Sequence, residues 1–352
     1  MAMQGNLNVY FGADGTGTNN SSSSFQDWAD SDHAGFTPPG TYKINDTVVL
    51  NRSKAMECFP GMSLVTGWDD GSGAYNTART YEQVRFVTDN TDPDFNMFQI
   101  EKEQQVWLGG CFDFSNLTSH SGAAFYLPTG WYLDSLGVGV RAGGWGGYIK
   151  GISVLGNVDT LRTSTVANPI GSRGIHIHFP TVSEYPTGDT RSHENAFMTM
   201  WFFEMQGAGL KRCIQHDPRI QLPNQHWSNT HHYEVRATHC HTAVWDEGAK
   251  DTEYHIRHRA GNVFGDLSTA QNTPSINFDY EGNMLIHPQF YDFRDDTDGG
   301  YYFNQKTLDL AGSGYVYGLS QDAYNRRIGI VQGPTIRMFN SVQFREGSVL
   351  IP

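Results

Sequence analysis

Two pairs of histidines in this chain are spaced for metal binding. They have the pattern His-x-His, at His176-Ile177-His178 and His239-Cys240-His241. On a β-strand, residues i and i+2 point to the same face, so both rings of a pair could bind one metal ion. His239 and His241 are the better candidates. Either motif can equally line a histidine-rich surface or a subunit interface, and we expect neither a metal nor another cofactor.

Acidic residues bear on whether the chain could cleave a polysaccharide. Glycoside hydrolysis needs two carboxyl groups near one bond, ~5–5.5 Å apart in retaining enzymes and ~6.5–9.5 Å apart in inverting ones. Glu204 and Asp246 are the candidate catalytic pair, because the coil register expected below puts them on neighbouring turns. The other acidic candidates of this region are Glu194, Asp217, Glu234 and Glu247.

A polysaccharide lyase would instead need a basic residue to remove a proton. Lys211, Arg212 and Arg236 could serve. No motif is diagnostic of catalysis, and each of these charges could equally be solvated or paired in a salt bridge. Enzyme activity is therefore uncertain, and we favour a protein that does not cleave its ligand.

Glycan binding is expected in and beside residues 216–230, a polar insertion in the coil pattern. Loops on a rigid scaffold commonly carry binding residues. Indole rings stack on sugar faces, and amides or carboxylates bond to the hydroxyls. The candidate glycan-binding residues are Trp227, His226, Asn229, Trp245 and Glu247. Packing in a core or interface is the alternative for both tryptophans, and it is the expected role of Trp201.

The elements that position these residues are predicted to be β-strands. The chain of 352 residues has 39 Gly, 21 Phe, 17 Tyr and 8 Trp, with 17% charged residues. Helical periodicity is rare, which indicates an all-β protein. Residues 175–179 and 254–258 alternate between apolar and polar side chains, as half-buried strands do.

An inward apolar residue recurs at intervals of roughly 20–30 residues, which predicts a stack of coils. A β-sandwich or jelly roll is the alternative. The predicted inward positions are Ile152, Ile175, Met200, Val235, Ile256 and Ile276.

Residues 1–44 predict a cap over the open end of this stack. A Gly- and Asn-rich turn precedes Ser21–Ser24, which are candidate helix N-caps. Phe25 and Trp28 would form the apolar face of one short helix, and Pro38-Pro39-Gly40 would turn into the next strand. Such a helix protects the edge of a sheet from pairing with another chain.

The order GADGTGTN, short helix, PPGTYKI resembles the N-terminal entry of pectate-lyase-like parallel β-helix proteins, most closely those of bacteriophage tailspikes and tail fibres. Asn19, Asn20 and Ser21 stand where that family usually has paired Asp residues. The resemblance implies an all-β fold, a right-handed single-stranded parallel β-helix with a short N-terminal capping helix. It also implies a homotrimer in the virion tail, assembled in the cytoplasm of the bacterial host.

The function implied by the resemblance is binding of a host-surface polysaccharide, with other phage tail proteins as partners. Two alternatives stay open: a polysaccharide depolymerase on the same fold, acting as glycoside hydrolase or lyase, and a structural virion adaptor or decoration protein. The expected regions are a cap at 1–44, irregular first coils at 45–148, regular coils at 149–290 and C-terminal strands with trimer contacts at 291–352.

Charge and cysteine usage exclude several other classes. The net charge of −13 argues against a nucleic-acid partner, which would need clustered Lys and Arg. Cys58, Cys111, Cys213 and Cys240 are scattered and predict neither a disulfide framework nor a structural zinc site. No secretory signal and no apolar run of membrane length is found, so we expect no membrane insertion.

Overall fold

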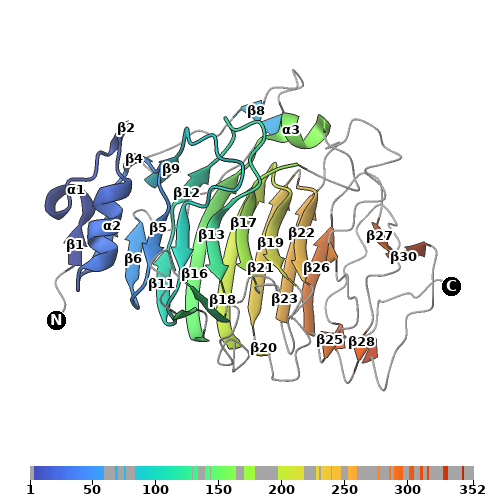
Figure 1. Cartoon of the computed structure of the whole chain (residues 1–352). Helices are drawn as coiled ribbons and strands as arrows, with labels where there is room; N and C mark the ends of the chain where they lie inside the picture. Colours follow the sequence, from blue (N-terminus) through green and yellow to red (C-terminus); the bar gives the residue numbers. More distant parts are fainter. Residues whose placement is uncertain are drawn as a thin grey trace.

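The computed structural model of this chain is all-β and built mainly of parallel strands. A 16-stranded and a 7-stranded sheet contain most of them, and strands lie side by side in the order of the sequence (Figure 1). The structure describes in full residues 5–58, 84–128, 146–161, 170–178, 198, 200–217, 231–237 and 240–245; further strand residues and the end of one helix are described by their backbone alone.

Three rows of parallel strands form the first part of the stack. Row one contains β1 (Gln4–Asn6), β3 (Ala34–Thr37), β6 (Ala55–Cys58) and β11 (Gln105–Leu108). Row two contains β2 (Thr16–Asn20), β4 (Gly40–Lys43), β9 (Val84–Val87) and β12 (Cys111–Asp113). Row three is the 7-stranded sheet: β5 (Val48–Leu50), β10 (Phe98–Ile100), β13 (Ala123–Pro128), β17 (Arg173–His178), β19 (Arg212–His216), β22 (Thr242–Asp246) and β24 (Ile276–Asn277). From β3 to β13 the chain visits the rows in the order one, two, three, and then starts the next circuit.

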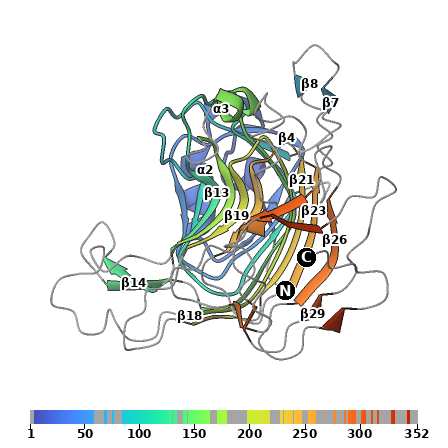
Figure 2. The same ribbon diagram turned by 90° about the vertical axis from the view of Figure 1, so that its right-hand side faces the viewer.

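Rows one and two merge at β16 (Gly144–Leu155), which pairs with β11 through its first half and with β12 through its second. Gly151 lies at the irregularity between the two halves, with a φ of 65° that favours glycine. Later circuits repeat this long strand in β18 (Phe197–Ala208), β21 (His232–Thr238), β23 (Glu253–Arg259) and β26 (Gln289–Asp295). Figure 2 shows how these strands curve around the stack.

The remaining elements are short. Antiparallel hairpins pair β7 (Trp68–Asp69) with β8 (Tyr75–Asn76), and β14 (Gly130–Leu133) with β15 (Gly139–Ala142). The helix α3 (Val158–Thr163) follows β16, and β20 (Trp227–Asn229) pairs with the start of β18. The other parallel strands are β25 (Leu285–Ile286), β27 (Tyr301–Asn304), β28 (Leu310–Ala311), β29 (Tyr315–Val316), β30 (Ile328–Val331) and β31 (Gln343–Phe344).

The core lies between the rows, where apolar side chains of successive circuits pair in register. The inward column of row three is Val48, Phe98, Phe125, Ile175, Ile214 and Val244, and the backbone register continues to Ile276. Aromatic rings fill the first circuits, where Phe98 lies 4.7 Å from Trp107 and 5.5 Å from Phe86 between ring centroids. In rows two and three, aliphatic side chains replace these rings in later circuits.

The predicted single column of inward residues was wrong, because more than one row supplies inward residues in each circuit. Ile152, Val235 and Ile256 align in the 16-stranded sheet, linked through Met205. Ile175 and Ile276 lie in row three instead. Met200 is 57% exposed and has a φ of 59°.

The N-terminal cap contains the predicted helix, α2 (Ser22–Asp30), with Phe25 and Trp28 fully buried. Ser21 is the N-cap but its side chain makes no capping bond. Asn20 accepts a hydrogen bond from the backbone N–H of Ser22 at 3.1 Å in its place. A second short helix, α1 (Leu7–Tyr10), and the strand β2 within the expected turn were not predicted.

All four cysteines are buried, and none of them is in a disulfide. None of the helices in the described part of the chain is long and apolar enough to cross a membrane.

Candidate functional site

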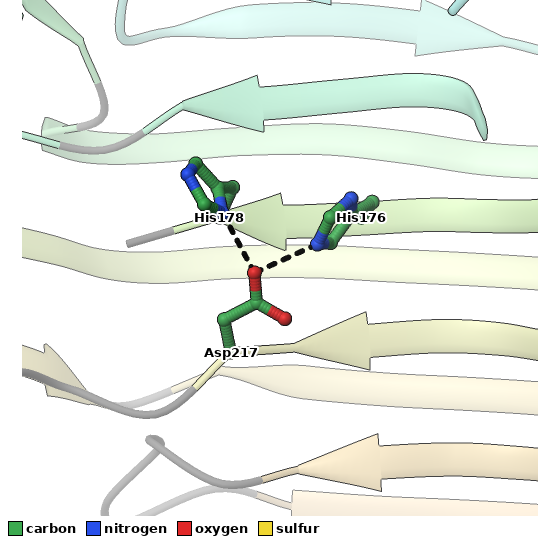
Figure 3. Close-up of side chains that lie close together, drawn as sticks. All are labelled: His176, His178 and Asp217. Carbon is green, nitrogen blue, oxygen red and sulfur yellow. Dashed lines mark hydrogen bonds and ion pairs between the residues drawn. The ribbon is translucent and has the colours of Figure 1, made fainter. Parts of the chain in front are cut away.

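The candidate site lies on the outer face of row three, where two histidines of β17 meet an aspartate that follows β19 (Figure 3). Ile175 and Ile177 are fully buried, so the alternation of the strand turns His176 and His178 outward. Asp217 comes directly after the last residue of β19. The parallel pairing of β17 with β19 brings its carboxylate to both rings.

Both imidazole rings contact the same oxygen of Asp217. His176 Nε2 lies 2.8 Å from Oδ2, and His178 Nδ1 lies 2.7 Å from it. Gln215 Nε2 donates to the other oxygen, Oδ1, at 2.6 Å. The backbone N–H of Asp217 donates to the carbonyl of Ile177 at 2.9 Å. The carboxylate is thus held from both of its oxygens and from its own backbone.

Tyr126 of β13 keeps the two rings in place. It pairs in register with His176. Its ring packs edge-on against His176, with centroids 5.4 Å apart, and stacks on His178 at 5.7 Å. The rings therefore have limited freedom to turn away from Asp217.

The protonation states follow from burial and these bonds. Burial raises the pKa of Asp217, but the attraction of His176 and the hydrogen bonds from His176, His178 and Gln215 outweigh it, so the pKa lies well below its usual range. Burial lowers the pKa of His176, although Asp217 opposes this. Near neutral pH, Asp217 is a carboxylate that can only accept, so each ring donates an N–H to it.

A group of cations lies beside this site. Arg173 donates to the side chain of Gln215 and to the carbonyl of Ser121. Burial, and then the charges of Arg173 and Arg212, lower the pKa of Lys211 to about 8. These three basic residues lie at or next to the starts of β17 and β19.

The outward residues of row three form a column of polar and aromatic side chains across five consecutive strands. Their register pairs place one above the next, and the column is Gln99, Tyr126, His176, Gln215 and Trp245. Trp245 is half-buried, and the guanidinium carbon of Arg212 lies 3.6 Å from the centre of its ring. One face of this indole is therefore already covered by a cation.

The candidate catalytic carboxylates lie on different sheets. Glu204 is on β18, and its register neighbour is Glu234 of β21. Asp246 ends β22 in row three, in register with His216. The register neighbour of Glu204 is therefore Glu234, and Asp246 continues the row-three register of Ile177 and His216, not that of His176.

The predicted glycan-binding residues are divided between the sheets. Trp227 and Asn229 belong to β20, in register with Phe197 and Thr199, so part of the expected loop 216–230 is a strand of the large sheet. Trp245 is the predicted residue that lies in the outward column. His226 and Glu247 lie outside the described residues.

The preferred histidine pair does not lie on one strand. His239 is outside the described residues, and His241 lies between β21 and β22. His241 is 3% exposed, and its Nδ1 lies 2.8 Å from the hydroxyl of Thr242. His241 belongs to no strand, and a metal site at this pair stays a prediction. A shared strand face is shown for His176 and His178, whose flanking isoleucines carried the signal of a half-buried strand.

No known protein family and no curated protein matches this sequence. Among solved structures, the ORF18 protein of Geobacillus virus E2 is 11% identical with a TM-score of 0.28; the match covers 88% of this chain and 60% of that one. The surface protein and adhesin PfbA of Streptococcus pneumoniae is 8% identical with a TM-score of 0.33, over 90% of this chain and 92% of that one. At these scores neither likeness bears on the fold, which rests on the strand pairing.

Proposed function

We propose that this chain is a bacteriophage tail fibre or tailspike protein that binds an extended, anionic glycan of the host surface along row three. Its fold in this proposal is a right-handed parallel β-helix closed by the N-terminal cap. The repeating circuits of parallel strands and the N-terminal order of turn, helix and Pro-Pro-Gly support that assignment. Fold alone does not give function, so the glycan site is argued from its side chains.

The observation that carries the proposal is the outward column of row three. Neighbouring strands are ~4.8 Å apart, so the column offers one side chain per step along the stack. A step of this size is comparable to the length of one sugar in an extended polysaccharide. Aromatic rings such as Tyr126 can contact sugar faces, and Gln99 can bond to hydroxyls.

The charge pattern favours an anionic ligand. The chain carries a net charge of −13, yet Arg173, Lys211 and Arg212 gather beside the column. Clustered cations on an otherwise acidic protein give local attraction for carboxylates or phosphates, and they disfavour neutral competitors. Uronic-acid or phosphate-bearing surface polysaccharides are therefore the expected ligand class.

Binding to purified acidic and neutral polysaccharides tests this proposal. Tyr126→Ala should weaken binding of the acidic ligand by about 1–2 kcal/mol, roughly tenfold, because one aromatic contact is lost. Tyr148→Ala is the matched control, since Tyr148 is 50% exposed on the large sheet. Loss of binding in Tyr148→Ala with full binding in Tyr126→Ala would overturn the assignment to row three.

Variants of Trp245 and Trp227 distinguish binding at row three from binding at the large sheet. Trp245→Ala removes an outward indole of row three, whereas Trp227→Ala alters β20 of the large sheet. The proposal expects Trp245→Ala to weaken binding more. The reverse order would favour recognition at residues 216–230.

A polysaccharide lyase is the second candidate, favoured by the lowered pKa of Lys211, about 8. A neutral amine beside two arginines could take the C5 proton of a uronate while the guanidinium groups stabilise the carboxylate. The C4–O bond would break as the proton is passed on to the departing oxygen, leaving a C4–C5 double bond and a free hydroxyl. Ultraviolet absorbance of that bond, lost in Lys211→Met, would establish cleavage. New reducing ends without unsaturation would instead indicate a hydrolase.

Assembly as a homotrimer is part of the same proposal, because a single stack leaves the outer faces and edges of its strands to be covered. Light scattering after gel filtration should give about three times the chain mass of 39.3 kDa. A monomer at micromolar concentration would contradict the trimer. A trimer with no affinity for any host polysaccharide would favour the structural adaptor or decoration role.

A further inference from the structure

We propose that His176, His178 and Asp217 form a binding site for one divalent transition-metal ion of the Zn²⁺ type. Among the residues that the structure describes, these three side chains form a group whose ligand atoms all lie within 4.8 Å of one another. The inference does not depend on the proposed glycan binding. It concerns only what this cluster can coordinate.

The first support is that the three donors converge on one point. Residues two apart on a strand are ~6.6–6.8 Å apart along the backbone, too far for identical ring atoms to meet easily. His176 presents Nε2 and His178 presents Nδ1, and this difference lets both rings reach Asp217 Oδ2 (Figure 3). Two nitrogens and one oxygen thereby occupy one face of a possible coordination sphere.

The spacing is close to that of a loaded site. Zinc is bound at ~2.0–2.1 Å by imidazole and ~2.0–2.2 Å by carboxylate, which makes ligand edges of ~3.3 Å in a tetrahedron. The present N···O edges of 2.8 and 2.7 Å need to open by about half an ångström. Small rotations of the side chains suffice.

Neighbouring side chains already orient the three ligands, as outer-shell residues do in metal sites. Gln215 Nε2 fixes the oxygen of Asp217 that does not face the rings, and Tyr126 packs on both imidazoles. Outer-shell bonds of this kind orient ligands and strengthen metal affinity. The strand pairing of β17 and β19 makes the arrangement part of the rigid stack.

The donor set selects the ion. Two imidazoles and one carboxylate suit Zn²⁺, Co²⁺ and related metals, whereas Ca²⁺ and Mg²⁺ prefer oxygen ligands. The side chains of His176, His178 and Asp217 are 14%, 20% and 15% exposed, so an ion can enter and keep a water or sugar oxygen as a further ligand. When the metal binds, His176 Nε2 and His178 Nδ1 give up the protons that they donate to Asp217. Each neutral ring then carries its proton on its other nitrogen.

Metal titration of the full chain, first stripped with a chelator, tests the proposal. Calorimetry with Zn²⁺ should give one strong site per chain, and Co²⁺ should produce the visible spectrum of a site with nitrogen and oxygen ligands. His178→Gln and Asp217→Asn should each abolish both signals. Circular dichroism of the metal-free variants checks that they fold.

Two further variants make the test specific. Gln215→Met leaves the three ligands and should weaken Zn²⁺ binding about 10–100-fold. His33→Gln, at an exposed histidine of the cap, should change nothing. The site is refuted if folded wild-type protein gives no Co²⁺ spectrum, or if folded His178→Gln and Asp217→Asn bind Zn²⁺ as wild type does.

Discussion

The side-chain amide of Gln26 bonds to both backbone groups of Val49, as a neighbouring β-strand would do. Its Oε1 accepts from the backbone N–H of Val49 at 2.8 Å, and its Nε2 donates to the carbonyl of Val49 at 3.1 Å. Val49 is the central residue of β5, the first strand of row three. The helix α2 thus satisfies the polar groups of an edge that could otherwise pair with another chain.

Replacing Gln26 by Met should therefore lower the free energy of unfolding by about 1–2 kcal/mol, because two backbone groups lose their partner. It should also increase self-association through the exposed edge. Urea denaturation and light scattering measure the two effects. Asp27→Met, at an exposed position of the same helix, is the control and should show neither. Equal stability of Gln26→Met and wild type would refute the role of this amide.

Phe98→Ala should destabilise the protein by about 3–5 kcal/mol, the cost of a cavity where a buried ring was removed. Phe98 is fully buried and in contact with rings from all three rows, including Phe86 and Trp107. The urea midpoint measures the loss. Gln99→Ala, on the outer face of the same strand, should cost far less. A similar loss in both variants would contradict the inward direction of Phe98.

Stability should fall in acid partly because of His120. Its Nε2–H donates to the carbonyl of Phe95 at 2.7 Å, and its Nδ1 accepts from the hydroxyl of Ser172 at 2.8 Å. Burial lowers the pKa of this ring from 6.5, although the bond to Phe95 opposes the shift. The unfolded chain therefore binds the proton first, and the contribution is complete above about pH 6.5 and lost as the pH falls toward the lower folded value.

The free energy of unfolding, measured between about pH 7 and pH 5, checks this sign. His120→Gln should be less stable near neutrality but should lose less stability on acidification. His33→Gln, at an exposed position, should keep the wild-type slope. An unchanged slope in His120→Gln would show that this ring does not couple folding to protons.

The sequence predicted local features better than it predicted register. Phe25 and Trp28 marked the helix because their spacing defines one apolar face, and both are fully buried. The assignment of Ile175 and Ile256 to one column failed because circuits contain several rows and insertions of different length. Spacing along the chain does not distinguish a residue of row three from one of the large sheet.

The candidate site could be predicted only in part for the same reason. The motif at His176 and His178 was visible because buried isoleucines alternate with the rings. Asp217 reaches them through the parallel pairing of β17 and β19. The segment between these strands is long, so the sequence alone does not reveal that they pair. The pair at His239 and His241 has the same spacing but no flanking isoleucines. That difference in the sequence favoured His176 and His178 as the pair on a half-buried strand.

The crowded rings of the first circuits also give this protein an optical signature. Trp28 of the cap and Trp107 of β11 lie 6.3 Å apart at 78° between ring planes. Aromatic rings held in a fixed packed arrangement produce circular dichroism in the near ultraviolet, which disappears when the packing is lost. That signal reports the docking of the cap on the stack, while far-ultraviolet dichroism reports the strands as a whole. Recording near- and far-ultraviolet circular dichroism during one denaturation would distinguish release of the cap from unfolding of the sheets, without any attached label.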